Sequence, residues 1–483
     1  MKDLILAILL NPVILLSIAS LISICAVLGL AWTSRYPKAF QLAEFISILF
    51  AIFCLTEVRL KPFFHWNLSF LVIGAQNQLL TNLQLLIYGY IVLVLRFKIL
   101  NFINLELRRF ASTYIFKNPF FWIIPPLGLA SCIWSETPGV TLGAAFLLVI
   151  INIFCTYLSA FFTWDELFLF LRWDTSIVAI LSFFIRTKTN AGTTSGGGLA
   201  GIMFSKNYLG ALMAFSASLW LVESLRSRRR PWVSIIMLLI TLVLLVQAKS
   251  GGAYFLFIAL AGIALSGQVL KKFRYSVAVF ITSLYFASTI FIGLVVFANL
   301  ESILGAFGKD LSFTGRTEIW PEVWRAVTDR LWFGYGVRGF WQYWRGADNP
   351  SMDWISGYWQ PPSAHMGYLD FWVELGLVGL GILFAALIIS VLQAIAHLIR
   401  TPGSASLLPL ITLIYVIIGN LAESRFLRPN FTWFVLSLVS IKLIVGDRQL
   451  RNTRQSTTDS PTSIDTLVSA PLPNSSMSIN PDQ

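Results

Sequence analysis

An arginine and a histidine are the side chains of this sequence whose chemistry suggests a site. Arg316 follows Gly315, which lets the backbone come close to a ligand, in the segment Thr-Gly-Arg-Thr-Glu-Ile-Trp of residues 314–320. A guanidinium presents a fork of donors that matches the paired oxygens of a diphosphate. His365 opens the segment His-Met-Gly-Tyr-Leu-Asp of residues 365–370. Histidine titrates near neutral pH, so an imidazole can take a proton from a hydroxyl group as a general base.

Both side chains also have ordinary structural explanations. Arg316 can stand at the start of a helix that Thr314 caps, with an ion pair to one of the two following glutamates. A lone histidine is more often structural than catalytic, and no second histidine or carboxylate stands at metal-ligand spacing around His365. We therefore expect no metal site and no cofactor, and the catalytic roles of Arg316 and His365 are a hypothesis.

Further polar residues stand at the ends of apolar segments and are predicted to bind substrate at the same site. They are Lys206, Asn207, Lys249 and Arg425. Cations gathered at one surface favour an anionic ligand. Lys249 has a second explanation, because a lysine at the end of a membrane span can extend its ammonium group to the membrane surface.

The elements that must position these residues are predicted to be membrane helices. Of the 483 residues, 57% are hydrophobic and only 12% are charged, whereas a soluble domain carries roughly 25% charged residues. Several apolar runs reach about 20 residues, the length of a helix that crosses a hydrocarbon core of ~30 Å. A membrane barrel would instead show short alternating segments. We predict an all-α polytopic membrane protein with about 12–14 transmembrane helices and one long external, partly helical loop.

The distribution of positive charge predicts which connections face the cytoplasm. The net charge is +12, and basic residues crowd the turns at 226–230 and 271–274. The positive-inside rule places such turns in the cytoplasm and explains the charge better than nucleic-acid binding does. By alternation, the long segment 300–372 is external, on the same side as the candidate site residues. Eight of the 17 tryptophans lie in this segment, which fits an interfacial aromatic belt and stacking on sugars equally.

Composition divides the chain into segments of different character. They are N-terminal transmembrane helices with a basic cytoplasmic link (1–118), central transmembrane helices (119–299), the long external loop (300–372), C-terminal transmembrane helices (373–446) and a disordered cytoplasmic tail (447–483).

Short motifs of this chain resemble those of the O-antigen ligase and Wzy-type polysaccharide polymerase superfamily. The motifs, in chain order, are the Trp-Ser-x-x-Pro turn of 134–138, the Lys-Asn pair at 206–207, the Gly-Arg-x-x-x-Trp segment of 315–320 and a histidine motif formed by His365, Gly376 and Gly379. The resemblance extends over about residues 130–445, and the motifs occur in the family's order.

The resemblance implies a metal-independent glycosyltransferase in the bacterial inner membrane. Such an enzyme moves an oligosaccharide from undecaprenyl diphosphate to a glycan, lipid or protein acceptor at the periplasmic face. Carried over to this chain, Arg316 would hold the donor diphosphate and stabilise the leaving group, and His365 would activate the acceptor hydroxyl. The implied partners are the lipid-linked donor, the acceptor and membrane lipids, without nucleic acid.

Two positions depart from the family's pattern. Met366 stands where a small polar residue usually follows the histidine, and Lys249 stands where ligases tend to carry a second arginine. A lysine supplies a point charge and no bidentate fork, so ligase and polymerase both remain open. A different class, a transporter of bicarbonate or another small anion, would carry ionisable residues near the bilayer midplane. Arg172 and Asp174 are the main candidates for such a position, as a local pair.

Overall fold

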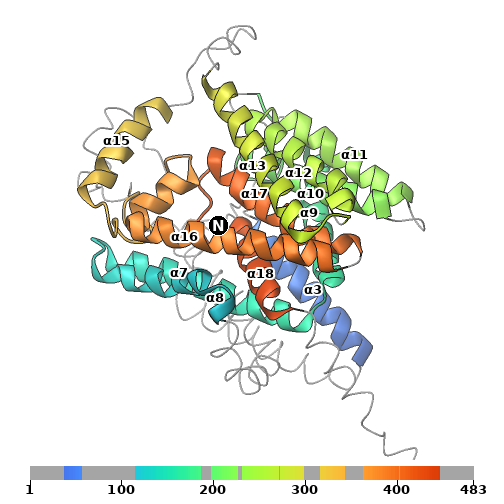
Figure 1. Ribbon diagram of the computed structural model, residues 1–483, viewed down its shortest axis with the longest axis horizontal. Helices are drawn as coiled ribbons and strands as arrows, with labels where there is room; N and C mark the ends of the chain where they lie inside the picture. The colour runs from blue at the N-terminus through green and yellow to red at the C-terminus, as the bar shows by residue number, and fades with distance from the viewer. Residues whose placement is uncertain are drawn as a thin grey trace, which may run out of the picture.

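The computed structural model describes residues 37–56, 115–186, 197–226, 231–270, 272–298, 316–342, 363–401 and 403–446. Within these ranges the regular structure is helical and contains no strand, which confirms the predicted all-α fold. Figure 1 shows the helices gathered in one bundle, with α15 at its edge beside the first half of α16. The helices are α3 (Pro37–Leu55), α6 (Ile115–Lys117), α7 (Pro119–Ala130), η2 (Ser131–Ile133), α8 (Pro138–Phe161), α9 (Trp164–Arg186), α10 (Lys206–Arg226), α11 (Pro231–Ala248), α12 (Gly251–Leu270), α13 (Tyr275–Ala298), α15 (Arg316–Asp329), α16 (Gly367–Arg400), η5 (Ser404–Leu407), α17 (Leu408–Ala422) and α18 (Phe431–Val445).

Six helical stretches of the described ranges are long and apolar enough to cross a membrane. They are Pro138–Phe161, Trp164–Ile185, Lys206–Arg226, Pro231–Ala248, Gly367–Arg400 and Ala405–Ala422. The chain is therefore a multi-pass membrane protein, as predicted. Further spans are predicted within segments 1–36 and 57–114, which lie outside the described residues, as does the tail from residue 447.

The outer surface of the bundle is apolar where lipid would contact it. On α11 the exposed side chains include Trp232, Ile235, Leu239, Val243 and Val246. They recur every three or four residues and so form one face of the helix. A continuous apolar face of this kind is rare on soluble monomers and suits contact with acyl chains.

The two ends of the bundle join different elements. At one end, called the site end below, Asn207 in the first turn of α10 donates a hydrogen bond to Glu423 (2.7 Å), and Glu423 contacts His365 before α16. At the opposite end, Arg226 in the last turn of α10 pairs with Asp165 of α9 at 2.9 Å. Since α10 has 21 residues, about 30 Å separates its two ends. Arg226 therefore lies far from the part of the long segment that carries His365, as charge alternation predicts.

A break in α16 gives the site end its shape. Gly376 has a φ of 69° and a ψ of −174°, so the helix pauses there and resumes in a new direction. The turn after α15 fills the break: Tyr335 N donates to Val373 O (2.9 Å), and Leu377 N donates to Leu331 O (2.8 Å). A Cβ at Gly376 would lie 2.1 Å from the Trp332 carbonyl oxygen, so only glycine allows this approach. The backbone groups that the helix break leaves open are thereby paired.

Candidate functional site

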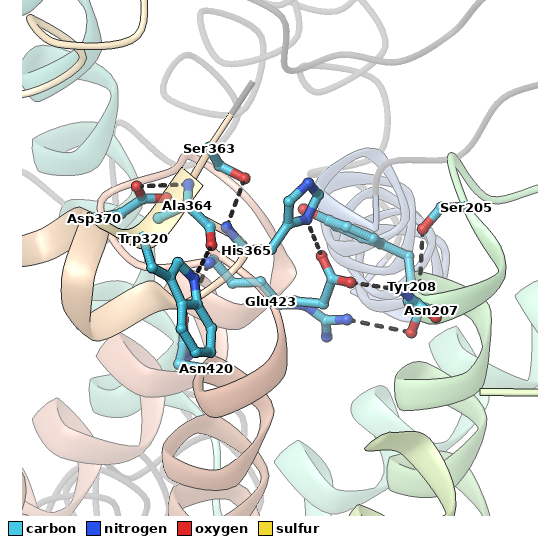
Figure 2. A network of polar contacts seen from close by, with 11 residues as sticks. Ser205, Asn207, Tyr208, Trp320, Ser363, Ala364, His365, Asp370, Asn420 and Glu423 are labelled. Carbon is cyan, nitrogen blue, oxygen red and sulfur yellow. Dashed lines mark hydrogen bonds and ion pairs between the residues drawn. The ribbon is translucent and has the colours of Figure 1, made fainter. Parts of the chain in front are cut away.

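The turn that carries His365 is held in an unusual backbone conformation. His365 has a φ of 53°, in the left-handed region that side chains other than glycine seldom adopt. Asp370 accepts hydrogen bonds from the Ala364 N–H (3.0 Å) and from the indole of Trp341 (2.8 Å). Trp320 of α15 donates its indole N–H to the Ala364 carbonyl at 2.9 Å, as Figure 2 shows. Contacts on both sides of Ala364 thus hold the strained turn in place.

His365 faces a carboxylate from a distant part of the chain. Its Nδ1 lies 3.5 Å from Oε2 of Glu423, which follows the end of α17, and the two side chains are 25% and 10% exposed. The other oxygen of Glu423 accepts a hydrogen bond from the Asn207 amide at 2.7 Å. In Figure 2 the second ring nitrogen of His365 points away from Glu423. An imidazole held beside a carboxylate in this way has the geometry that general-base chemistry requires.

Arg425 brings a buried cation to the same place. It donates to the Tyr415 hydroxyl (3.2 Å) and to the Asn207 carbonyl (3.4 Å), and its guanidinium lies 4.5 Å from the ring centre of Tyr208. Together with both tyrosines it lines a small cavity of about 20 Å³, room for about one water molecule. The predicted binding residues Asn207 and Arg425 are therefore in contact with each other and, through Glu423, with His365.

A second ion pair links the start of α16 to the turn after α17. Arg428 contacts Glu374 of α16 at 3.0 Å, and the two side chains are 11% and 1% exposed. Burial by itself lowers the pKa of Arg428, but the charges of Glu374 and Asp370 raise it more, so the net shift is upward. Arg428 is thus held in its charged form, and its pair with Glu374 braces the turn after α17 against α16.

The remaining predicted residues stand at the ends of α10, α11 and α15. Arg316 is the first residue of α15, one turn before Trp320, which places its backbone about 6 Å along the helix axis from a contact to the His365 turn; its side chain lies outside the described atoms. Lys206 begins α10, next to Asn207. Lys249 is exposed, has a φ of 50° and stands between α11 and α12. Their roles remain predictions.

The turn of residues 134–138 packs against the turn that follows α15. Trp134 donates its indole N–H to the Phe333 carbonyl at 3.0 Å. Ser131 Oγ accepts from Val337 N at 3.1 Å, and a Cβ at Gly336 would come within 2.8 Å of the Ser135 Cβ. The connection between α7 and α8 therefore packs against the turn that fills the α16 break.

The predicted local pair of Arg172 and Asp174 is wrong. Arg172 instead forms an ion pair with Glu223 of α10 and lies 4.8 Å from the ring centre of Trp220. Residues two apart on a helix point in different directions, so the two side chains cannot meet within α9. Asp174 is fully buried, and neither of its carboxyl oxygens has a hydrogen-bond partner in the described part of the chain.

Sequence reasoning did not identify the partners of His365. Glu423 stands 58 residues after His365 in an acid-and-base turn that also fits a simple surface charge. Asp370 reads as a first-turn acid of α16 that complements the helix dipole. One weak signal was available in the sequence. Three charged residues, Glu423, Arg425 and Arg428, stand within six residues between two apolar runs.

Comparison with known proteins bears on this site. A model of the O-antigen ligase family matches residues 126–384, more than half of the 483 residues. The matched range includes Lys206, Arg316 and His365 and ends before Glu423 and Arg425. The chain is also 27% identical over 143 residues to the exopolysaccharide production protein ExoQ of Rhizobium meliloti (strain 1021). That alignment covers 28% of this chain and 32% of the relative, so the chain matches about a third of the relative's length.

Proposed function

Because the chain belongs to the O-antigen ligase family, we propose that it is a membrane glycosyltransferase that transfers or polymerises a glycan carried on undecaprenyl diphosphate. The reaction takes place at the periplasmic face of the bacterial inner membrane, where the segment 300–372 forms the external loop. The observation that most supports this is the meeting of His365, Glu423 and Asn207 at one end of the bundle. A base oriented at the membrane surface suits deprotonation of an acceptor hydroxyl.

In the proposed reaction, His365 takes the proton of the acceptor hydroxyl. The acceptor oxygen forms a bond to the anomeric carbon of the glycan, and the bond from that carbon to the diphosphate oxygen breaks. The lipid diphosphate leaves with the bonding electron pair. Arg316 holds the diphosphate through two parallel hydrogen bonds and stabilises the charge that develops on it, an effect that is large where water is excluded.

The other cations contribute to donor binding. Lys206 and Lys249 add positive charge at the same end of α10 and α11, and Arg425 presents a guanidinium fixed by Tyr208 and Tyr415. A diphosphate carries charge enough for several such partners. Substitution of these residues would weaken donor binding. None of them takes a direct part in proton transfer.

The experiment uses purified protein and lipid-linked glycan extracted from a strain that lacks it. We expect His365→Ala to spare donor binding and to slow transfer by about 10²–10⁴-fold, the usual contribution of a general base. Arg316→Lys keeps the charge and loses the fork, so donor binding and turnover both fall. EDTA leaves the rate unchanged if the mechanism needs no metal.

Product size on a gel separates the two enzyme types. Chains that lengthen by repeat units identify a polymerase, and a single transfer to a lipid or protein acceptor identifies a ligase. Full activity in His365→Ala would refute the base assignment. Full loss with EDTA would refute the metal-independent mechanism.

One observation favours a second function, the transport of a small anion such as bicarbonate. Asp174 and the Arg172–Glu223 pair place ionisable groups inside the bundle. Such groups in membrane helices often mark transport pathways. Uptake of labelled bicarbonate by vesicles that contain the purified protein, lost in Asp174→Asn, would support transport. Vesicles that transfer glycan and take up no bicarbonate would exclude it.

A further inference from the structure

We propose that Glu423 is a positioning residue for His365 and that Asn207 in turn positions Glu423. In this arrangement Glu423 accepts a hydrogen bond from the protonated Nδ1 of His365, so that Nε2 keeps its lone pair for the acceptor hydroxyl. The inference rests on the proposed role of His365 as the base and goes beyond it. Glu423 and its turn lie outside the range that the family model matches.

The contacts determine which ring nitrogen carries the proton. An ionised carboxylate only accepts hydrogen bonds, so a ring nitrogen that approaches it does so as a donor. The Nδ1 to Oε2 distance of 3.5 Å is long for a hydrogen bond, but contacts of this kind often shorten only when substrate binds. Nε2 is on the far side of the ring from Glu423, as Figure 2 shows, and is the atom left to act as the base.

Glu423 is itself held in place from the other side. Its Oε1 accepts from the Asn207 amide at 2.7 Å, and the Asn207 carbonyl accepts from Arg425 at 3.4 Å. The carboxylate is mostly buried, so its position is set by these partners more than by water. The order from base to support is therefore His365, Glu423, Asn207 and Arg425, drawn from three separate segments.

The backbone also holds the two turns at a constant separation. Asn420, at the end of α17, accepts hydrogen bonds from the backbone N–H groups of Arg425 (3.0 Å) and Phe426 (3.1 Å). A Cβ added to Gly367 would lie only 2.2 Å from the same oxygen, so the start of α16 packs directly against it. One buried amide thus locks the Glu423 turn against the segment that carries His365.

This arrangement has a clear electrostatic consequence during transfer. When the acceptor hydroxyl gives its proton to Nε2, the imidazole becomes an imidazolium next to the Glu423 carboxylate. The carboxylate stays ionised and stabilises the new positive charge, as the acid of a Ser-His-Asp triad does. The proton leaves to solvent after the lipid diphosphate has departed, which restores the base.

The first test compares Glu423→Gln with the wild type in the transfer assay. We expect a rate lower by about 10²-fold, because the amide no longer selects the tautomer or stabilises the imidazolium. The acidic limb of the pH–rate profile moves to lower pH, since a nearby negative charge favours the protonated ring. Arg425, which donates to the Asn207 carbonyl at 3.4 Å, keeps its charge in this variant. Glu136→Gln is the matched control, because that acid pairs with Arg330 of another turn.

The second test reads the tautomer directly. The chain has three histidines, so ¹⁵N-histidine labelling gives few signals, and His365→Ala identifies the one of interest. Solid-state NMR of the wild type in lipid vesicles, above the acidic limb, shows His365 with the proton on Nδ1. Glu423→Gln gives a mixture of tautomers, and Glu136→Gln leaves the spectrum unchanged. A role of Glu423 in folding alone would not alter the tautomer of a protein that remains folded.

Each outcome decides between the two proposals. Wild-type activity in His365→Ala overturns the base assignment and this inference together. An inactive His365→Ala with an unchanged rate, profile and spectrum in Glu423→Gln overturns only the role of Glu423. A slow Glu423→Gln with a wild-type spectrum and profile also overturns it, as evidence of a structural role. If Glu423→Gln does not fold, Asn207→Ala replaces it, with an expected loss of about 10-fold and a mixed tautomer; a wild-type rate and spectrum there overturn the inference.

Discussion

The His365–Glu423 and Glu374–Arg428 pairs join the same two segments, the start of α16 and the turn after α17. Yet they have opposite properties. The first pair has side chains 25% and 10% exposed and includes an imidazole, which can accept and release a proton. The second has side chains 11% and 1% exposed, and its arginine is held in the charged form by a raised pKa. The same kind of contact therefore serves two purposes. The partly exposed pair suits proton transfer, and the buried pair fixes the distance between the segments.

The largest effect is expected when the buried Glu374–Arg428 pair loses one partner. Arg428→Ala leaves Glu374 buried without its partner, and such a change typically costs about 3–5 kcal/mol of stability. We expect a large drop in thermal stability and in membrane yield, measured by size-exclusion chromatography of the detergent-solubilised protein after heating. The double variant Glu374→Leu with Arg428→Met removes both charges and should recover part of the loss. A wild-type melting profile for Arg428→Ala would contradict the bracing role.

A smaller loss of stability is expected when the break in α16 at Gly376 is altered. Gly376→Ala puts a Cβ 2.1 Å from the Trp332 carbonyl oxygen and forces a side chain into a left-handed conformation. The strain alone corresponds to about 1–3 kcal/mol. We expect lower thermal stability and a change in the fluorescence of the exposed Trp332. Gly381→Ala is the control in the same helix, because nothing lies within 4 Å of its Cβ. Equal stability of the two variants would argue against a required break.

The smallest effect is expected at an exposed ion pair of the site end. Arg330 contacts Glu136 at 2.7 Å, and the side chains are 38% and 37% exposed. Solvent screens such pairs, which typically contribute about 0–1 kcal/mol. Glu136→Gln should therefore shift the melting temperature little and should become indistinguishable from wild type in high salt. A loss as large as that of Arg428→Ala would show that burial does not separate the pairs.

The sequence alone was enough to predict the helical membrane class, the separation of Arg226 from the His365 segment, and the family whose model matches residues 126–384. These properties are local or additive. The length of an apolar run decides whether a helix spans the membrane, and the charge of a turn decides its side. Motif spacing is likewise visible along the chain. Arg316 and His365 could be nominated for the same reason.

Only the tertiary structure decided which groups meet. Asn207, His365 and Glu423 come together from three segments because α10, α16 and α17 pack at one end of the bundle. The break at Gly376 arises from a turn more than 30 residues earlier that fills the gap, whereas the residues around it are those of a continuous apolar helix. The pairing of Arg172 with Glu223 has the same origin, because the packing of α9 against α10 decides which side chains of the two helices face each other.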